Sequence, residues 1–438
     1  MKKYLVLFIA LFFITELTFS QSIINLINRS GEYVDALENG KFEEAHGFFD
    51  ESVKNKVRPD DLKNFWTSIN ASLGTFESVE NAQNKVQDEF YVVTLKCKFS
   101  KGKQAFQFAF NKSEKIVGFF IAPKNNAPIY QQPAYADSTL YKEQHVSIKT
   151  EGHELAGLFT TPKTGNNFPV IVLVHGSGPA DMDETVGPNK PFKDLAMGLA
   201  AKGIATIRYV KRTRVYPGEF AKAFTLKEEV TDDALAAIAL ARTLPGINKK
   251  QIYVLGHSLG GMVSPKLATQ SPDLNGIILA AAPARKFTDV IIEQNKFFFE
   301  SLKDTSTAAR EQFQKALKEF EKTRITELGT VKADSLLLGI PASYWVDMNQ
   351  YDQTGIAKKL KTRILVLQAE HDIQVSTTDY NLWKSVLEKK KNATFKLYPS
   401  LNHLFISQPE KSTAELYKNP GNVDAVVLND IALWVKGS

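Results

Sequence analysis

Cysteine is almost absent from this sequence, because Cys97 is the only one among 438 residues. A single thiol excludes an internal disulfide and leaves no cysteine cluster that could bind zinc. Histidines and acidic residues do not occur at the spacing of a zinc-binding helix, and the glycine-rich stretches lack the lysine of a phosphate-binding loop. The sequence therefore predicts no metal and no other cofactor.

Blocks of one charge sign are also scarce. The 54 lysines and arginines are interspersed with 48 acidic residues, and the formal net charge is +6. The one dense basic run, Lys389–Lys391, lies at the end of an expected helix, where cations interact favourably with the helix dipole. Nucleic acid is therefore not an expected partner.

Long apolar runs are missing apart from one near the start. Residues 4–14 are apolar, follow two lysines, and are too short to span a bilayer comfortably. The small residues Thr18 and Ser20 then stand where a signal peptidase requires them, so Met1–Ser20 matches a secretory signal peptide. We expect export to the periplasm or the exterior, with no stable membrane insertion after cleavage. An uncleaved membrane anchor is the alternative.

The length of the chain favours two domains. In residues 21–123, helical patterns precede strand patterns, which is typical of a compact α+β domain. The expected helices are 23–38, 42–49 and 59–73, and the expected strands are 76–79, 90–99, 104–111 and 116–121. Residues 124–140 contain Pro128 and Pro133 and show little periodicity, which indicates an extended linker.

Strand and helix patterns alternate in residues 141–438, the second predicted domain. Because the strands are apolar throughout, they favour a mainly parallel sheet with helices on both faces, the doubly wound α/β architecture. The expected strands are 145–149, 154–161, 169–174, 204–209, 251–255, 276–282, 364–368 and 394–398. The expected helices are 191–202, 226–243, 262–269, 377–388 and 423–434. Residues 285–361 show helical patterns and no strand pattern, and this long insertion is predicted to cap the carboxyl edge of the sheet.

The most informative motif is Gly256–Gly260, a Gly-His-Ser-Leu-Gly pentapeptide with Ser258 at its centre. An apolar strand, Gln251–Leu255, precedes it and a helical pattern follows it. Glycines on both sides of a serine allow a strained strand-to-helix turn that exposes the hydroxyl, which is the geometry of a nucleophile elbow. We expect His257 to have a structural role. The alternative for Ser258 is an ordinary helix N-cap.

A serine nucleophile needs a base, which is usually a histidine held by a carboxylate. One common arrangement along the chain is serine, acid, histidine. Asp372 and His403 follow two consecutive expected strands, so both are predicted to lie at the sheet edge that carries Ser258. The competing candidates are Glu370, Asp379 and Asp352 for the acid, and His371 as a weaker base.

A second glycine-rich turn, His175–Pro179, follows the apolar strand at 169–174. Acyl transfer places negative charge on a carbonyl oxygen, which preorganised backbone N–H groups stabilise. We expect the N–H groups of Ser177 and Leu259 to form this oxyanion hole. The alternative interpretation of His175 and Gly176 is a plain tight turn after a strand.

With these motifs in place, the chain from about residue 141 onward resembles the α/β-hydrolases, in particular a secreted bacterial group with a small N-terminal domain. Residues 21–123 resemble the NTF2-like domains of unknown function, of the DUF3887 type, that precede such hydrolases. In the group that the chain resembles, an aspartate often follows the strand that ends here at Tyr209, whereas this sequence has Val210 at that position. Further matching stretches are Leu338–Pro341 with Tyr344 and Trp345, Tyr398–Pro399, and Leu401–Phe405.

The resemblance implies a triad that hydrolyses a small-molecule carboxylic ester through an acyl-enzyme. Three aromatic cap residues would line an apolar pocket or simply pack in the core of the cap; these are Phe298, Tyr344 and Trp345. Because related members cleave peptides, a peptidase similar to the prolyl oligopeptidases is the nearest alternative, followed by a thioesterase and a non-catalytic binding protein. The N-terminal domain would shape the mouth of the site, bind part of the substrate, or form a homodimer.

Overall fold

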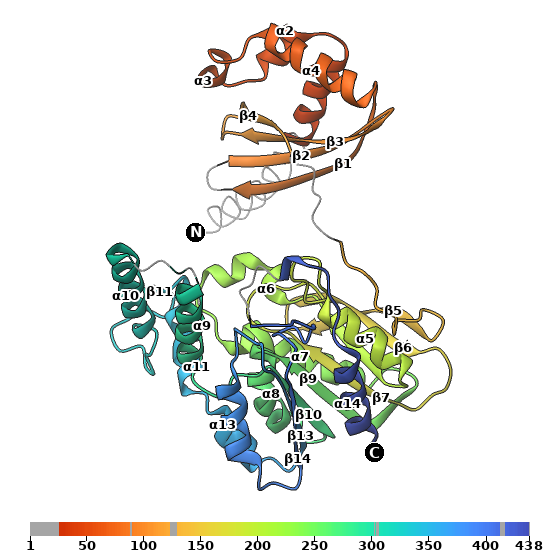
Figure 1. The fold of residues 1–438 in the computed structure, drawn as a ribbon, viewed down its shortest axis with the longest axis vertical. Coiled ribbons are helices and arrows are strands. Elements are labelled where there is room, and N and C mark those ends of the chain that lie inside the picture. Colours follow the sequence, from red (N-terminus) through yellow and green to blue (C-terminus); the bar gives the residue numbers. More distant parts are fainter. Residues whose placement is uncertain are drawn as a thin grey trace, which may run out of the picture. The chain divides into compact units, whose positions relative to one another are not determined.

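The computed structural model describes residues 26–87, 90–122, 129–301, 303, 306–411 and 417–437. The chain divides into two compact units, Met1–Asn126 and Ala127–Ser438, and each contains its own sheet (Figure 1). The predicted signal peptide, Met1–Ser20, and residues 124–128 of the predicted linker lie outside the described residues. In the described part of the chain, no helix is both long and apolar enough to cross a membrane.

The first unit packs helices against an antiparallel sheet. Its helices are residues 26–38, α2 (Phe42–Gly47), α3 (Glu51–Lys54) and α4 (Pro59–Leu73). Its strands are β1 (Phe76–Gln87), β2 (Phe90–Phe99), β3 (Gly102–Phe110) and β4 (Ile116–Ile121), hydrogen-bonded in the order β1-β2-β3-β4. The predicted α+β character of this region is confirmed.

Aromatic side chains fill the core of this unit. Phe106, Phe108 and Phe110 alternate along β3 and are fully buried, because successive side chains of a strand point to opposite faces. β1 runs well past Val79, the last residue of the predicted strand. The residues after it are polar and show no apolar alternation, but their backbone groups pair with Tyr91–Lys96 of β2.

The second unit is built on an eight-stranded sheet. Its strands are β5 (Tyr141–Thr150), β6 (His153–Pro162), β7 (Phe168–Val174), β8 (Ala205–Tyr209), β9 (Ile247–His257), β10 (Gly276–Ala280), β13 (Arg363–Ala369) and β14 (Ala393–Tyr398). The spatial order of the strands is β14-β13-β10-β9-β7-β8-β6-β5. The first six strands in this order are parallel to one another. β6 is antiparallel to β8, and β5 is antiparallel to β6. This arrangement confirms the predicted doubly wound α/β class.

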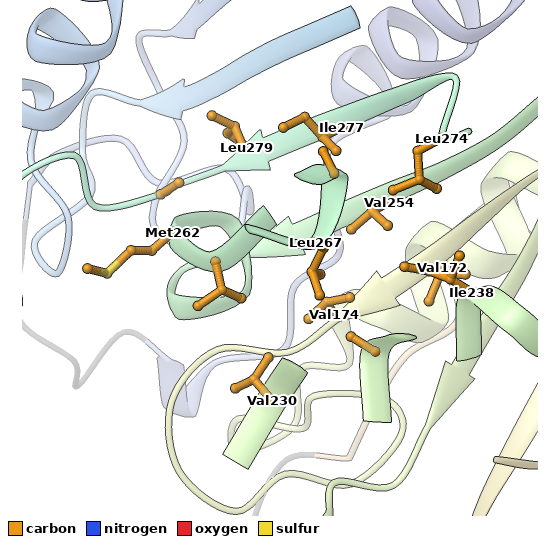
Figure 2. Close-up of a cluster of buried hydrophobic side chains, with 14 of the residues drawn as sticks. Val172, Val174, Val230, Ile238, Val254, Met262, Leu267, Leu274, Ile277 and Leu279 are labelled. Carbon is orange, nitrogen blue, oxygen red and sulfur yellow. The ribbon is translucent and has the colours of Figure 1, made fainter. Parts of the chain in front are cut away.

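Two apolar layers cover the two faces of this sheet. Val170, Val172 and Val174 of β7 face one layer, and Ile171 and Leu173 face the other. The first layer contains side chains of α7 (Asp232–Ala241), α8 (Leu259–Gln270) and α13 (Thr377–Leu387). Figure 2 shows part of this layer, where Leu267 of α8 lies beside Val174 of β7. The second layer contains α5 (Pro191–Ala201) and α14 (Ala425–Lys436).

The insertion between β10 and β13 is mostly helical. It contains α9 (Phe287–Ser301), α10 (Thr307–Glu321), α11 (Ala342–Gln350) and α12 (Gln353–Lys359). Phe299 and Phe313 stack at a ring separation of 4.4 Å and join α9 to α10. A two-stranded hairpin, β11 (Leu336–Leu337) with β12 (Ile340–Pro341), was not predicted, because two-residue strands leave no periodic pattern.

Candidate active site

Ser258 occupies the sharp turn between β9 and α8. Its backbone lies at φ 52° and ψ −118°, a strained conformation for a residue with a side chain, and its N–H donates to the Ala280 carbonyl at 2.9 Å. The turn brings α8 directly against β7, so that a Cβ atom on Gly260 would lie 2.2 Å from the Val174 carbonyl oxygen. Glycine is therefore required at 260, and the serine side chain stays partly exposed at the sheet edge.

His403 and Asp372 form a buried pair. The His403 Nδ1–H donates to Asp372 Oδ2 at 2.7 Å, and both side chains are almost fully buried. The other carboxylate oxygen, Oδ1, accepts the N–H groups of Gln374 at 2.7 Å and Val375 at 2.9 Å. Because an ionised carboxylate only accepts, the proton lies on Nδ1 and Nε2 of His403 is free to act as a base.

A pocket of about 160 Å³ brings Ser258 and His403 together. It lies between the loop after β7, the elbow and the loop after β14. Its lining residues are Gly176, Ser177, Pro179, Ala180, Glu184, Thr185, Val186, His257, Ser258, Gln374, His403 and Leu404. Asp372 lies behind His403, so the acid, the base and the serine follow one another toward the pocket.

Two of the three competing acids have other partners. Asp379 accepts the N–H groups of Ala284 and Arg285 and pairs with the Arg285 guanidinium. Asp352 caps α12 by accepting the Gly355 N–H at 2.9 Å. The alternative base, His371, is hydrogen-bonded through Nδ1 to the Gln408 carbonyl. Among these candidates, Asp372 alone contacts His403 in the described structure.

Two backbone N–H groups border the serine. Leu259 is the first residue of α8, and a first-turn N–H has no acceptor within its own helix. Ser177 lines the pocket from the loop after β7. In the described part of the chain no hydrogen bond is formed by the Ser177 N–H, although its neighbours Gly176 and Gly178 both donate.

Family and sequence comparisons identify the family of the chain. A family model described as serine aminopeptidase, S33, matches residues 192–410, and a model for a protein of unknown function, DUF3887, matches residues 30–119. Esterase EstD of Thermotoga maritima is 34% identical over 403 residues, which cover 92% of this chain and 93% of that protein. The chain belongs to the S33 family of α/β-hydrolases.

Solved structures are also similar to this S33 hydrolase. Est1E from Butyrivibrio proteoclasticus matches 67% of the chain and 99% of its own length, with 16% identity and a TM-score of 0.43. The esterase domain of a Rhodothermus marinus protein matches 68% of the chain and 98% of its own length, with 14% identity and a TM-score of 0.42.

The predicted aromatic cap residues lie elsewhere in this S33 hydrolase. Tyr344 and Trp345 are buried on α11; the Tyr344 ring packs on Phe224 at 5.2 Å, and the Trp345 indole N–H donates to the Leu337 carbonyl. Phe298 on α9 is 54% exposed. None of the three predicted residues lines the described pocket; Tyr344 belongs to the buried core against the sheet, and Trp345 packs on Phe287 of α9.

Sequence patterns missed a second buried pair beside the serine. His257 Nδ1 lies 2.9 Å from Glu184 Oε2 in an ion-pair contact, and its Nε2–H donates to the His403 carbonyl at 2.9 Å. Burial alone would lower the pKa of His257 and raise that of Glu184. The attraction between their charges reverses both directions, so the pKa of His257 lies above 6.5 and that of Glu184 below 4.5.

Glu184 left no signal in the sequence. It belongs to an irregular loop, adopts a positive φ of 52°, and reaches a histidine that is remote along the chain. Its Oε1 atom accepts the Gly176 N–H at 2.6 Å. The pair therefore connects three segments of the site: the loop after β7, the elbow, and the loop that carries His403.

Proposed function

We propose that this protein is a serine esterase that cleaves small carboxylic esters through an acyl-enzyme. The observation that carries the proposal is the buried Asp372–His403 hydrogen bond, because its histidine lines the same pocket as Ser258. The 34% identity to Esterase EstD, over nearly the whole of both chains, supports the same activity.

In the first half of the reaction, Ser258 Oγ attacks the ester carbonyl while His403 Nε2 takes the hydroxyl proton. Asp372 holds the imidazole ring and stabilises the imidazolium that forms. The N–H groups of Ser177 and Leu259 stabilise the negative carbonyl oxygen. Collapse of the tetrahedral intermediate breaks the ester C–O bond, and His403 returns the proton to the departing alcohol. Water then attacks the acyl-enzyme with the same proton transfers and releases the carboxylic acid.

The family description also raises the possibility of aminopeptidase activity. An aminopeptidase must bind the ammonium group of its substrate, which requires a carboxylate with free acceptor capacity. Glu184 is the one carboxylate among the described lining residues, and it is engaged by His257 and by the Gly176 N–H. A neutral ester fits this lining better than a charged peptide terminus does. Rates on p-nitrophenyl esters and on aminoacyl p-nitroanilides separate the two activities.

The test of the mechanism is Ser258→Ala in the full-length protein. We expect hydrolysis of p-nitrophenyl butyrate to fall by at least about 10⁴-fold with an unchanged circular dichroism spectrum, because no other group replaces the nucleophile. Ser385→Ala, an exposed serine of α13, is the matched control and should keep wild-type activity. A fluorophosphonate should label Ser258 alone. Hydrolysis that survives Ser258→Ala contradicts the proposal.

A further inference from the structure

Lys211 is a buried cation beside the loop that carries Ser177. Its residue exposure is 2%, and its ammonium group donates to three acceptors: the Gly176 carbonyl at 2.7 Å, the Gly178 carbonyl at 3.0 Å, and Glu229 Oε1 at 2.8 Å. An ammonium group has three N–H donors, so every one is used. Two of the three acceptors are backbone carbonyls of the loop on either side of Ser177.

The contact with the Gly176 carbonyl determines where the Ser177 N–H points. The carbonyl of Gly176 and the N–H of Ser177 belong to one planar trans peptide group, in which they point in opposite directions. A cation bound to the carbonyl oxygen therefore fixes the N–H on the opposite side, where Ser177 lines the pocket. It also polarises the peptide group, which makes the N–H a stronger donor.

Glu229 completes the arrangement. Its Oε1 atom accepts both the Lys211 ammonium and the Gly178 N–H, the latter at 3.0 Å, and its side chain is buried. Glu229 lies in η2 (Lys227–Thr231), a π-helical turn that leads into α7. Such turns are rare and are often found at functional sites. The buried phenol of Tyr344 lies beside Glu229; burial and this carboxylate together hold its pKa well above 10.

We propose that Lys211 and Glu229 are positioning residues that hold the Ser177 N–H in the orientation that stabilises the oxyanion. The proposal rests on the proposed esterase function. Neither side chain touches the substrate, since both act through the peptide groups of the loop. Their removal should therefore weaken the transition state much more than the bound ester.

The experiment is Lys211→Met in the full-length enzyme, which removes the donors and keeps an unbranched side chain that is one atom shorter. We expect kcat for p-nitrophenyl butyrate to fall on the order of 100-fold while KM changes less than about threefold, because an oxyanion donor is misaligned. The affinity for an alkyl trifluoromethyl ketone, which forms a tetrahedral oxyanion on the serine, should fall by the same factor as kcat/KM.

Lys211→Met leaves Glu229 as an unpaired buried charge, which can prevent folding. The double variant Lys211→Met/Glu229→Gln removes both charges together and should show the same losses. The matched control is Arg212→Met/Asp233→Asn, since this neighbouring pair is also buried and is bonded to Thr150 rather than to the loop. The control should lose stability to a similar extent and keep wild-type kcat and ketone affinity.

The outcomes separate the inference from the function on which it rests. Wild-type kcat and ketone affinity in the folded Lys211→Met/Glu229→Gln variant overturn the inference and leave a Ser258-dependent esterase standing. An equal loss of kcat in the Arg212→Met/Asp233→Asn control also overturns it, because the effect would then follow from any lost ion pair. A wild-type protein that hydrolyses no ester overturns both.

Discussion

Gly260 packs so tightly against the end of β7 that it supports a quantitative prediction for Gly260→Ala. The added Cβ atom would lie 2.2 Å from the Val174 carbonyl oxygen and 2.7 Å from the His175 carbonyl oxygen. Ordinary van der Waals contact begins at about 3.4 Å, so the nearer contact is more than 1 Å too short. Both oxygens belong to the end of β7 and the turn that follows, so no side-chain rotation relieves the overlap.

The helix and the strand must separate by roughly 1 Å to accept the new methyl group. α8 is buried along most of its length, with Leu259, Met262 and Val263 fully covered, so the separation disturbs a close-packed layer. We expect a loss of about 3 kcal/mol in the free energy of unfolding, the upper end of the range for overpacking. Because α8 begins directly after Ser258, the proposed nucleophile, a displacement of this size should also lower kcat about 100-fold.

Urea unfolding followed by tryptophan fluorescence gives the stability, and p-nitrophenyl butyrate gives the rate. The control is Gly218→Ala, since its Cβ would meet no atom within 4 Å and its backbone has no positive φ. That variant should lie within about 0.5 kcal/mol of the wild type, as surface substitutions do. If Gly260→Ala matches the control in both assays, the elbow does not require glycine at 260 and the reasoning from contact distances is wrong.

Two further predictions concern the buried side chains of the site. Asp372→Asn should lower kcat by about 10³- to 10⁴-fold with little change in KM, because an amide favours the wrong tautomer of His403; normal kcat would assign the acid to another residue. Burial lowers the pKa of His175 to about 4, against 6.5 in the unfolded chain, so the unfolded state alone binds a proton between these values and stability falls as pH falls from 6.5 to 4. Wild type should lose about 3 kcal/mol more than His175→Leu over that window in urea titrations, and equal losses would refute the assignment.

Much of the fold follows from local patterns. The strands of the second unit appear in the sequence as apolar runs because both faces of its sheet are covered, and the helices between them keep a regular apolar period. The chain order of Ser258, Asp372 and His403 predicted that they lie at one edge of the sheet, because parallel strands bring their carboxyl ends to the same edge. These residues are recognisable since each one lies in the turn or loop that follows a strand.

The parts that escaped prediction depend on contacts between remote segments. The polar half of β1 is a strand because β2 supplies its hydrogen-bond partners, and no local pattern marks it. For Tyr344 and Trp345 the sequence left open whether they line a pocket or pack in the core of the cap, because burial there depends on how α11 packs. Lys211, Glu184 and Glu229 are charged residues in irregular or π-helical segments, where a sequence pattern indicates only solvent exposure.

Buried ion pairs add little net stability, since the cost of removing two charges from water offsets their attraction. Their position in this protein suggests another reason for their presence. In the proposed mechanism the Ser177 N–H must stay without a protein partner, so the loop after β7 cannot adopt a regular turn that satisfies all of its backbone groups. Side chains must then satisfy the remainder: Glu184 binds the Gly176 N–H, Glu229 binds the Gly178 N–H, and Lys211 binds both carbonyls. The three buried charged side chains therefore satisfy the other backbone groups of the loop and leave the Ser177 N–H without a partner among the described residues.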